Sequence, residues 1–257
     1  MRWTYSGREE SIVTQRSRAR SPNIYAIGVR DQRNCADGST FQRSVRFFMI
    51  ACCVMQFSSP SNHYTQRWFS TFLGRVDSSI VANEMSFLES VIPRATVHLV
   101  VRGDMRRLPI RSDGVDAISN MWQSFGQFDR VTDGLVLVEW ARVLRPRGRL
   151  VIDLYNRAFH KQGSRVRHIL RDGVDITEVR ATECGRLSVT LTCAAPEIAD
   201  DESRSDRFEW QLYFPEELTA EAALAGLELE RVCTGFDDRQ SPTPESPRMQ
   251  AVFVRAD

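Results

Sequence analysis

Cysteine and histidine are the residue types through which this chain could hold a metal ion, and their spacing does not suit that chemistry. The residues concerned are Cys35, Cys52, Cys53, Cys184, Cys193, Cys233, His63, His98, His160 and His168. No two cysteines form a C-x-x-C pair, and no His-x-x-x-His spacing is present. We therefore expect no metal site and interpret the cysteines as buried thiols in a reducing compartment.

Composition narrows the class of protein. The chain has 257 residues, of which 42% are hydrophobic and 26% charged, as in a globular protein with one large domain or two small ones. A net charge of +1 gives no field that attracts nucleic acid or a membrane. The sequence contains neither an apolar run of about 18 residues nor a signal peptide. We expect a cytoplasmic protein with a small-molecule partner, whose oligomeric state the sequence leaves open.

Residues 1–57 differ from the remainder. They contain nine arginines and four acidic residues, whereas the rest of the chain has a small acidic excess. The stretch 11–22 lacks any apolar period, and two apolar runs follow at 24–29 and 47–57. We interpret 1–57 as an irregular basic extension. A tail that contacts RNA or acidic lipid, and translated sequence upstream of the true start, remain alternatives.

Alternating helices and short apolar strands begin after residue 58. Helices are predicted at 77–92 and 132–144, and strands at 97–101, 115–120 and 149–155. The residues expected to face the core are Ile80, Val81, Met85, Leu88 and Val91 in the first helix and Leu135, Val138 and Ala141 in the second. This alternation is typical of a parallel sheet covered by helices.

The pattern changes in the last third of the chain. Four segments within 164–213 alternate apolar and polar residues, which predicts an antiparallel insertion or lid with one face in water. A helix follows from Pro215 to about Gly226. Strands at 227–233 and 249–254 are expected to close the sheet.

Several motifs on these elements resemble those of the class I S-adenosylmethionine-dependent methyltransferases. They are GDMRRLP at 103–109, VDAISNMWQSFG at 115–126, VLRPRGRL at 143–150 and YFPEEL at 213–218. The resemblance extends over about residues 62–257. It implies an α/β, Rossmann-like sheet in domain 58–257, with S-adenosylmethionine across the carboxyl ends of the strands. The activity it implies is methyl transfer to a small-molecule nucleophile.

The resemblance also assigns residues to the cofactor. Asp104 would accept a hydrogen bond from the adenine amine, and Met105 would pack on the adenine ring. Asn120 would lie near the methionine portion, while Trp122 and Phe125 would line the methyl-transfer region, where an aromatic face attracts the sulfonium cation. Purely structural roles remain open: Asp104 can cap a turn, Met105 can fill the core, and both aromatic rings can be ordinary packing.

The substrate side is assigned in the same way. Tyr155, Asn156 and Arg157 follow a strand and would face the substrate, together with Phe125. Tyr64 and Trp68 resemble a family segment that closes over the pocket. Tyr155 and His160 are candidates for the base that removes a proton from the nucleophile.

One family feature has no counterpart. The glycine-rich loop after the first strand, and the acid that ends the second strand, normally hold the cofactor. No two of the 14 glycines are closer than eight positions, so the sequence contains no G-x-G. The first predicted helix ends near Ile92–Pro93, and only Arg94, Ala95 and Thr96 then precede the strand at 97–101. The sheet is therefore expected to be incomplete and the cofactor site degenerate.

Each buried aliphatic side chain contributes ~1.5–3 kcal/mol to folding, and the free energy of unfolding of a domain is ~5–15 kcal/mol. The loss of two central strands would therefore remove more stability than a domain has. The apolar runs at 24–29 and 47–57 offer a substitute: strands that pair beside 97–102 or 115–120. Asp31 could then replace the missing ribose-binding acid. Two other hypotheses stay open, namely a non-catalytic methyltransferase-like protein and a chain with an internal deletion or frame error.

Overall fold

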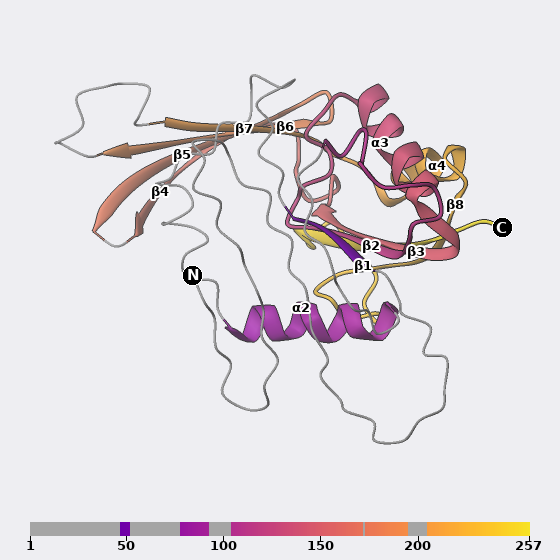
Figure 1. Ribbon diagram of the computed structural model, residues 1–257. Helices are drawn as coiled ribbons and strands as arrows, with labels where there is room; N and C mark the ends of the chain where they lie inside the picture. Colours follow the sequence, from indigo (N-terminus) through magenta and orange to yellow (C-terminus); the bar gives the residue numbers. More distant parts are fainter. Residues whose placement is uncertain (1–46, 52–77, 93–103, 172, 195–204) are drawn as a thin grey trace, which may run out of the picture.

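A computed structural model describes residues 47–51, 78–92, 104–171, 173–194 and 205–257. Two sheets and three helices make up this part of the chain (Figure 1). The helices are α2 (Ser78–Val91), α3 (Arg130–Val143) and α4 (Pro215–Leu224). The strands are β1 (Phe47–Ala51), β2 (Val115–Met121), β3 (Leu144–Tyr155), β4 (Gly163–Arg171), β5 (Val174–Glu183), β6 (Arg186–Ala194), β7 (Ser205–Gln211), β8 (Leu227–Cys233) and β9 (Arg248–Arg255).

The larger sheet has the order β1-β2-β3-β9-β8. β1, β2 and β3 are parallel, whereas β9 is antiparallel to both β3 and β8. β1 pairs with β2 from Phe47 opposite Ala117 to Ala51 opposite Met121. This pairing confirms that the apolar run at 47–57 supplies a strand beside 115–120. The run at 24–29, the strand expected at 97–101 and Asp31 lie outside the described residues.

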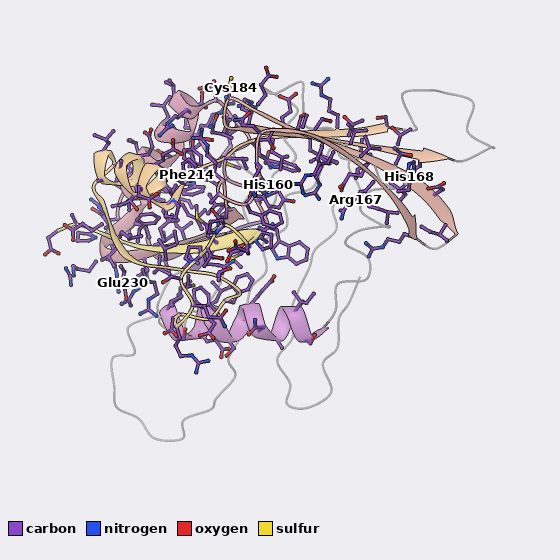
Figure 2. All side chains as sticks on the ribbon, turned by 180° about the vertical axis from the view of Figure 1, so that it is seen from behind. His160, Arg167, His168, Cys184, Phe214 and Glu230 are labelled. Carbon is purple, nitrogen blue, oxygen red and sulfur yellow. The ribbon has the colours of Figure 1, made fainter. Side chains whose placement is uncertain are left out.

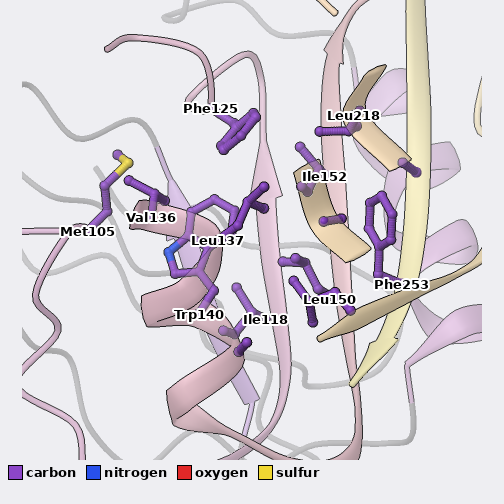
Figure 3. Close-up of a cluster of buried hydrophobic side chains, with 14 of the residues drawn as sticks. Met105, Ile118, Phe125, Val136, Leu137, Trp140, Leu150, Ile152, Leu218 and Phe253 are labelled. Atoms are coloured by element: carbon purple, nitrogen blue, oxygen red, sulfur yellow. The ribbon is translucent and has the colours of Figure 1, made fainter. Parts of the chain in front are cut away.

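Helices cover both faces of this sheet: α3 and α4 lie on one face and α2 on the other (Figure 1). The core on the α3 and α4 side contains Trp140, Phe125, Tyr213 and Phe253, all at most 1% exposed (Figure 3). The core on the α2 side is smaller and includes Phe87 with Val151 and Val252. Both faces of β2 and of the second half of β3 are therefore buried, as expected for parallel strands.

The inward face of α3 was predicted wrongly in part. Ala141 is buried, but Leu135 is 58% and Val138 52% exposed. The buried residues of the helix are Asp133, Val136, Leu137, Trp140, Ala141 and Val143. The indole of Trp140 offers the largest apolar surface on the helix, and turning it inward places Leu135 and Val138 in water.

The prediction for the first helix also needs correction, because Ile80 is 51% exposed. Only the last turns of α2, with Leu88 and Val91, are buried against the sheet. Of the described cysteines, Cys193 and Cys233 are buried, but Cys184 is exposed. Cys184 and Gly185 both have positive φ in the tight turn between β5 and β6, a position at the surface of the lid.

The second sheet confirms the predicted antiparallel insertion. It has the order β4-β5-β6-β7 and extends from the larger sheet (Figure 1). We call this sheet the lid. One of its faces carries a buried cluster that includes Ile176, Leu187, Phe208 and Trp210. We call this face the inner face of the lid. Among the described residues, no helix is long and apolar enough to cross a membrane.

Candidate active site

The carboxyl ends of the three parallel strands meet at one edge of the larger sheet, where ligands of such folds bind. The lid is attached at the same edge, since β4 follows β3 and β7 leads back toward α4. The main-chain N–H of Gln211 donates to the carbonyl of Gly126, 2.6 Å away, and thereby joins the lid to the loop after β2. This edge is the candidate active site.

The first group at this edge is Trp122, directly after β2. Trp122 and Gln123 both have φ of +61°, a left-handed conformation that is costly for residues with a side chain and often occurs at functional sites. The main-chain N–H of Trp122 donates to Oδ2 of Asp153 at 2.9 Å, and its indole N–H donates to Oε2 of Glu84 at 3.0 Å. Trp122 is 37% exposed, so part of the residue is in contact with solvent.

Beneath Trp122 lies a buried carboxylate on β3. Asp153 is 1% exposed and accepts hydrogen bonds from Nε of Arg248, at 3.1 Å, and from Nε2 of Gln250, at 2.8 Å. A terminal nitrogen of Arg248, Nη2, donates to the other carboxylate oxygen, Oδ2. The ion pair holds Arg248 against the end of β3, and removing either partner would leave a buried charge uncompensated.

Glu84 brings a second carboxylate to this cluster from α2. Burial raises its pKa, and the nearby charge of Asp153 adds to the rise, while the hydrogen bond from Trp122 and the charge of Arg248 oppose it. The net effect is a raised pKa. Glu84 therefore holds its proton more strongly than an exposed glutamate and connects α2 to the strand edge.

The second aromatic group at the edge surrounds Tyr155. Its ring makes edge contacts with the rings of His160 and Trp210, with centroids 5.0 Å and 5.6 Å away. The guanidinium of Arg248 lies 5.0 Å from the Tyr155 centroid. Tyr155 thus connects the Asp153–Arg248 pair to the lid. Its ring neighbour His160 is labelled in Figure 2.

His160 is neutral at physiological pH. Burial, followed by the positive charges of Arg180 and Arg248, lowers its pKa to about 4. The ring bonds the main chain of Pro247, and Nε2 is buried without a hydrogen-bond partner among the described residues. These contacts assign the proton to Nδ1 and leave Nε2 as an acceptor.

The structure therefore brings Trp122, Tyr155 and His160 to one edge, whereas six other predicted site residues are engaged elsewhere. Phe125 is 1% exposed and packs between Trp140 and Tyr213. Asn120 is fully buried within β2. Asn156 and Arg157 are held by a loop and by α4, respectively. Tyr64 and Trp68 lie outside the described residues.

Asn156 and Arg157 form contacts within the protein. The side-chain amide of Asn156 donates to the carbonyls of Thr243, at 2.8 Å, and Ser246, at 3.0 Å, and so fastens the loop before β9. Arg157 donates to both carboxylate oxygens of Glu217, at 2.7 Å and 2.8 Å. In this conformation both side chains position backbone elements around the site.

The two residues assigned to adenine are also engaged. The carboxylate of Asp104 accepts from the main chain and the guanidinium of Arg106, at 2.7–3.1 Å. Burial alone would raise the pKa of Asp104, but these contacts with Arg106 outweigh it and hold the pKa below its usual value. Met105 is 2% exposed and belongs to the core beside Trp140.

Four groups at this edge were not predicted from the sequence: Glu84, Asp153, Arg248 and Trp210. One signal was available for Asp153, because an acidic residue interrupts the otherwise apolar run 150–154. A buried acid needs a partner, which Arg248 provides from β9. Nothing in the local sequence around Glu84 or Trp210 distinguishes them from surface or core residues.

No protein-family model and no curated protein matches the sequence. Solved structures do match. The methyltransferase CcbJ from Streptomyces caelestis is 18% identical over 63% of this chain and 64% of its own, with a TM-score of 0.52. An S-adenosylmethionine-dependent methyltransferase from Clostridium acetobutylicum is 13% identical over 70% of this chain and 73% of its own, with a TM-score of 0.53.

The chain therefore spans less than two thirds of the length of CcbJ. At these identities the likeness shows the fold. The chain has the fold of the class I S-adenosylmethionine-dependent methyltransferases, which confirms at this level the resemblance that its motifs indicated.

Proposed function

We propose that this protein transfers a methyl group from S-adenosylmethionine to a small-molecule nucleophile. The observation that carries the proposal is the pairing of β1 beside β2, because it gives the parallel sheet a third strand where the motif comparison left a gap. The shared carboxyl edge of β1, β2 and β3 then carries Trp122, Tyr155 and His160, one cation-attracting ring and two groups able to contact a nucleophile.

The described residues fit one side of the cofactor. The partly exposed ring of Trp122 suits the sulfonium, since an aromatic face attracts a cation. The adenine side does not fit as it is arranged here, because Arg106 occupies the Asp104 carboxylate and Met105 is in the core. S-adenosylmethionine supplies, when bound, a methyl group on a positively charged sulfur.

The roles of the chain's own residues follow from their protonation and exposure. His160, neutral and with Nε2 free to accept, holds the O–H or N–H of the nucleophile by a hydrogen bond. With a pKa of about 4 it is a weak base, so we assign it to orientation of the nucleophile and expect the proton to reach solvent. The ring of Tyr155 packs against the ring of His160 and helps to hold it in position.

Calorimetry with S-adenosylhomocysteine tests this proposal on the full chain. We expect wild type, Trp122→Phe and Leu224→Ala, an exposed change on α4, to bind S-adenosylhomocysteine. With S-adenosylmethionine, whose sulfonium cation the ring attracts, we expect Trp122→Ala to bind at least tenfold more weakly than wild type, and Leu224→Ala to match wild type. Folded wild-type protein that gives no binding heat would refute the proposal.

A non-catalytic role is the second candidate, and the Asp104–Arg106 pairing favours it together with the missing G-x-G. If S-adenosylhomocysteine raises the melting temperature of wild type but not of Asp104→Ala, the carboxylate serves the cofactor and catalysis is favoured. An equal rise in both proteins would show that Asp104 does not serve the cofactor, and no rise in either protein would favour the non-catalytic role.

A further inference from the structure

The inner face of the lid carries arginines beside its apolar cluster. Residues directly opposite on antiparallel strands point to the same face, and Arg165 on β4 lies opposite Arg180 on β5. Two positions along, Arg167 lies opposite Glu178. The same register continues through β6 to Phe208 on β7. We call Arg165, Arg167 and Arg180 the lid arginines.

Among the residues that the structure describes, the lid arginines outnumber the carboxylates that pair with them. Arg167 and Arg180 share one carboxylate, that of Glu178, with Nη2 of Arg167 at 2.9 Å and Nε of Arg180 at 2.7 Å. Within the described part of the chain, Arg165 makes no ion pair. A second acid in the same cross-strand row as Glu178 is Asp206, which lies on β7, two strands away.

Two arginines opposite each other repel, and such pairs destabilise a sheet unless an anion lies between them. The excess is therefore expected to serve a ligand. Arg248, held over Tyr155, adds a fourth guanidinium at the base of the lid. The positive charges of Arg180, Arg248 and Arg165 all lower the pKa of His160, so each of the three lies near enough to act on its ring.

Two buried hydrogen-bonding atoms belong to the rings that pack against Tyr155. Nε2 of His160 is an acceptor and Nε1 of Trp210 is a donor, and neither has a partner among the described residues. Both rings contact Tyr155. Because buried polar atoms are almost always paired in folded proteins, a ligand that donates to His160 and accepts from Trp210 would satisfy both.

We propose that the inner face of the lid, at Arg165 and Arg180, binds an anionic group, carboxylate or phosphate, of the molecule that is methylated. This inference rests on the proposed function for the ligand's identity as acceptor. Guanidinium groups pair with both kinds of anion through two parallel hydrogen bonds. The acceptor is thus a small acid whose O–H or N–H lies at His160 while its anionic group lies on the lid.

Anion binding is measured by calorimetry on the full chain at constant ionic strength, with inorganic pyrophosphate and citrate as probes and xylitol as the uncharged control. We expect one of the two anions to bind and xylitol not to bind. Pyrophosphate alone would assign a phosphate site, and citrate alone a carboxylate site. Binding of neither anion by folded wild type would overturn the proposal.

Matched variants locate the anion. Arg165→Gln and Arg180→Gln are expected to weaken binding about tenfold each. Arg207→Gln, on the same sheet but with its side chain on the opposite face, is expected to stay within twofold of wild type. Equal weakening by all three variants would indicate a general charge effect and overturn the site. Both Arg165 and Arg207 are exposed, so neither change threatens folding.

The same proteins separate this inference from the proposed function. If S-adenosylhomocysteine does not bind but the anion does so through Arg165, the lid site stands and methyl transfer falls. If S-adenosylhomocysteine binds and Arg165→Gln leaves anion binding unchanged, methyl transfer stands and the lid site falls.

Discussion

The buried carboxylate of Asp133 makes the stability of this fold depend on pH. Asp133 lies on α3, is 1% exposed and accepts a hydrogen bond from the hydroxyl of Tyr213 at 2.8 Å. Burial raises its pKa from 3.8 to about 7, although the Tyr213 hydrogen bond opposes the rise. The folded state therefore binds this proton more tightly than the unfolded state does.

The direction and size of the effect follow from that difference. Stability from Asp133 is complete below about pH 4, decreases as pH rises, and is lost once pH has passed about 7. At about 1.4 kcal/mol for each pH unit between the two pKa values, the loss between pH 4 and pH 8 is about 4 kcal/mol.

Asp133→Asn tests this reasoning, because the amide imitates the protonated carboxyl and does not titrate. The assay is urea unfolding at pH 4, 6 and 8, with exposed Asp175→Asn as the control. We expect the variant to match wild type at pH 4 and to be more stable at pH 8. Tyr213→Phe should extend the decrease to higher pH, since it removes the bond that favours the ionised form. A variant that is less stable than wild type at pH 8 would refute the reasoning.

Three further changes have expected outcomes. Gly126→Ala should destabilise the fold by about 2 kcal/mol or more in thermal unfolding, because φ is +87° and the new Cβ would lie 2.6 Å from the Gln211 carbonyl oxygen. An unchanged free energy of unfolding would contradict the attachment of the lid at this loop. Asn156→Ala should make the loop 243–247 more sensitive to protease, with about 1–3 kcal/mol lost, whereas unchanged cleavage would show that its two hydrogen bonds are dispensable. Glu84→Gln should retain the indole hydrogen bond and bind S-adenosylhomocysteine within twofold of wild type, and a tenfold loss would assign its charge to the site.

Much of the fold could be predicted from the sequence because its signals are local. Alternation within 164–213 gave the four lid strands, and Pro215 with two glutamates after it gave the start of α4. The apolar run at 47–57 gave β1, but only once the gap before residue 97 required a substitute. The inward face of α3 was predicted from the spacing of Leu135, Val138 and Ala141. In the structure, the face that contains Trp140 packs on the sheet instead.

The candidate site was harder to predict because it depends on pairs that are distant in the chain. Asp153 and Arg248 are 95 residues apart, and Glu84 and Trp122 are 38 apart. No local period connects them. The motif comparison placed Trp122, Tyr155 and His160 at one edge, but it could not show that Arg106 engages Asp104 or that Asn156 fastens a loop. Those contacts depend on side-chain geometry within the folded chain.

The central claim is that β1 completes the parallel sheet on which the proposed methyltransferase site depends. Hydrogen exchange at the amides of 47–51 tests this claim most directly. Amides that pair across a ladder exchange only when the strand opens. The structure predicts that the amides of β1 which bond to β2 exchange far more slowly than an unfolded chain, and that S-adenosylhomocysteine slows them further. Exchange of these amides at the unfolded rate, with and without the ligand, would contradict the account.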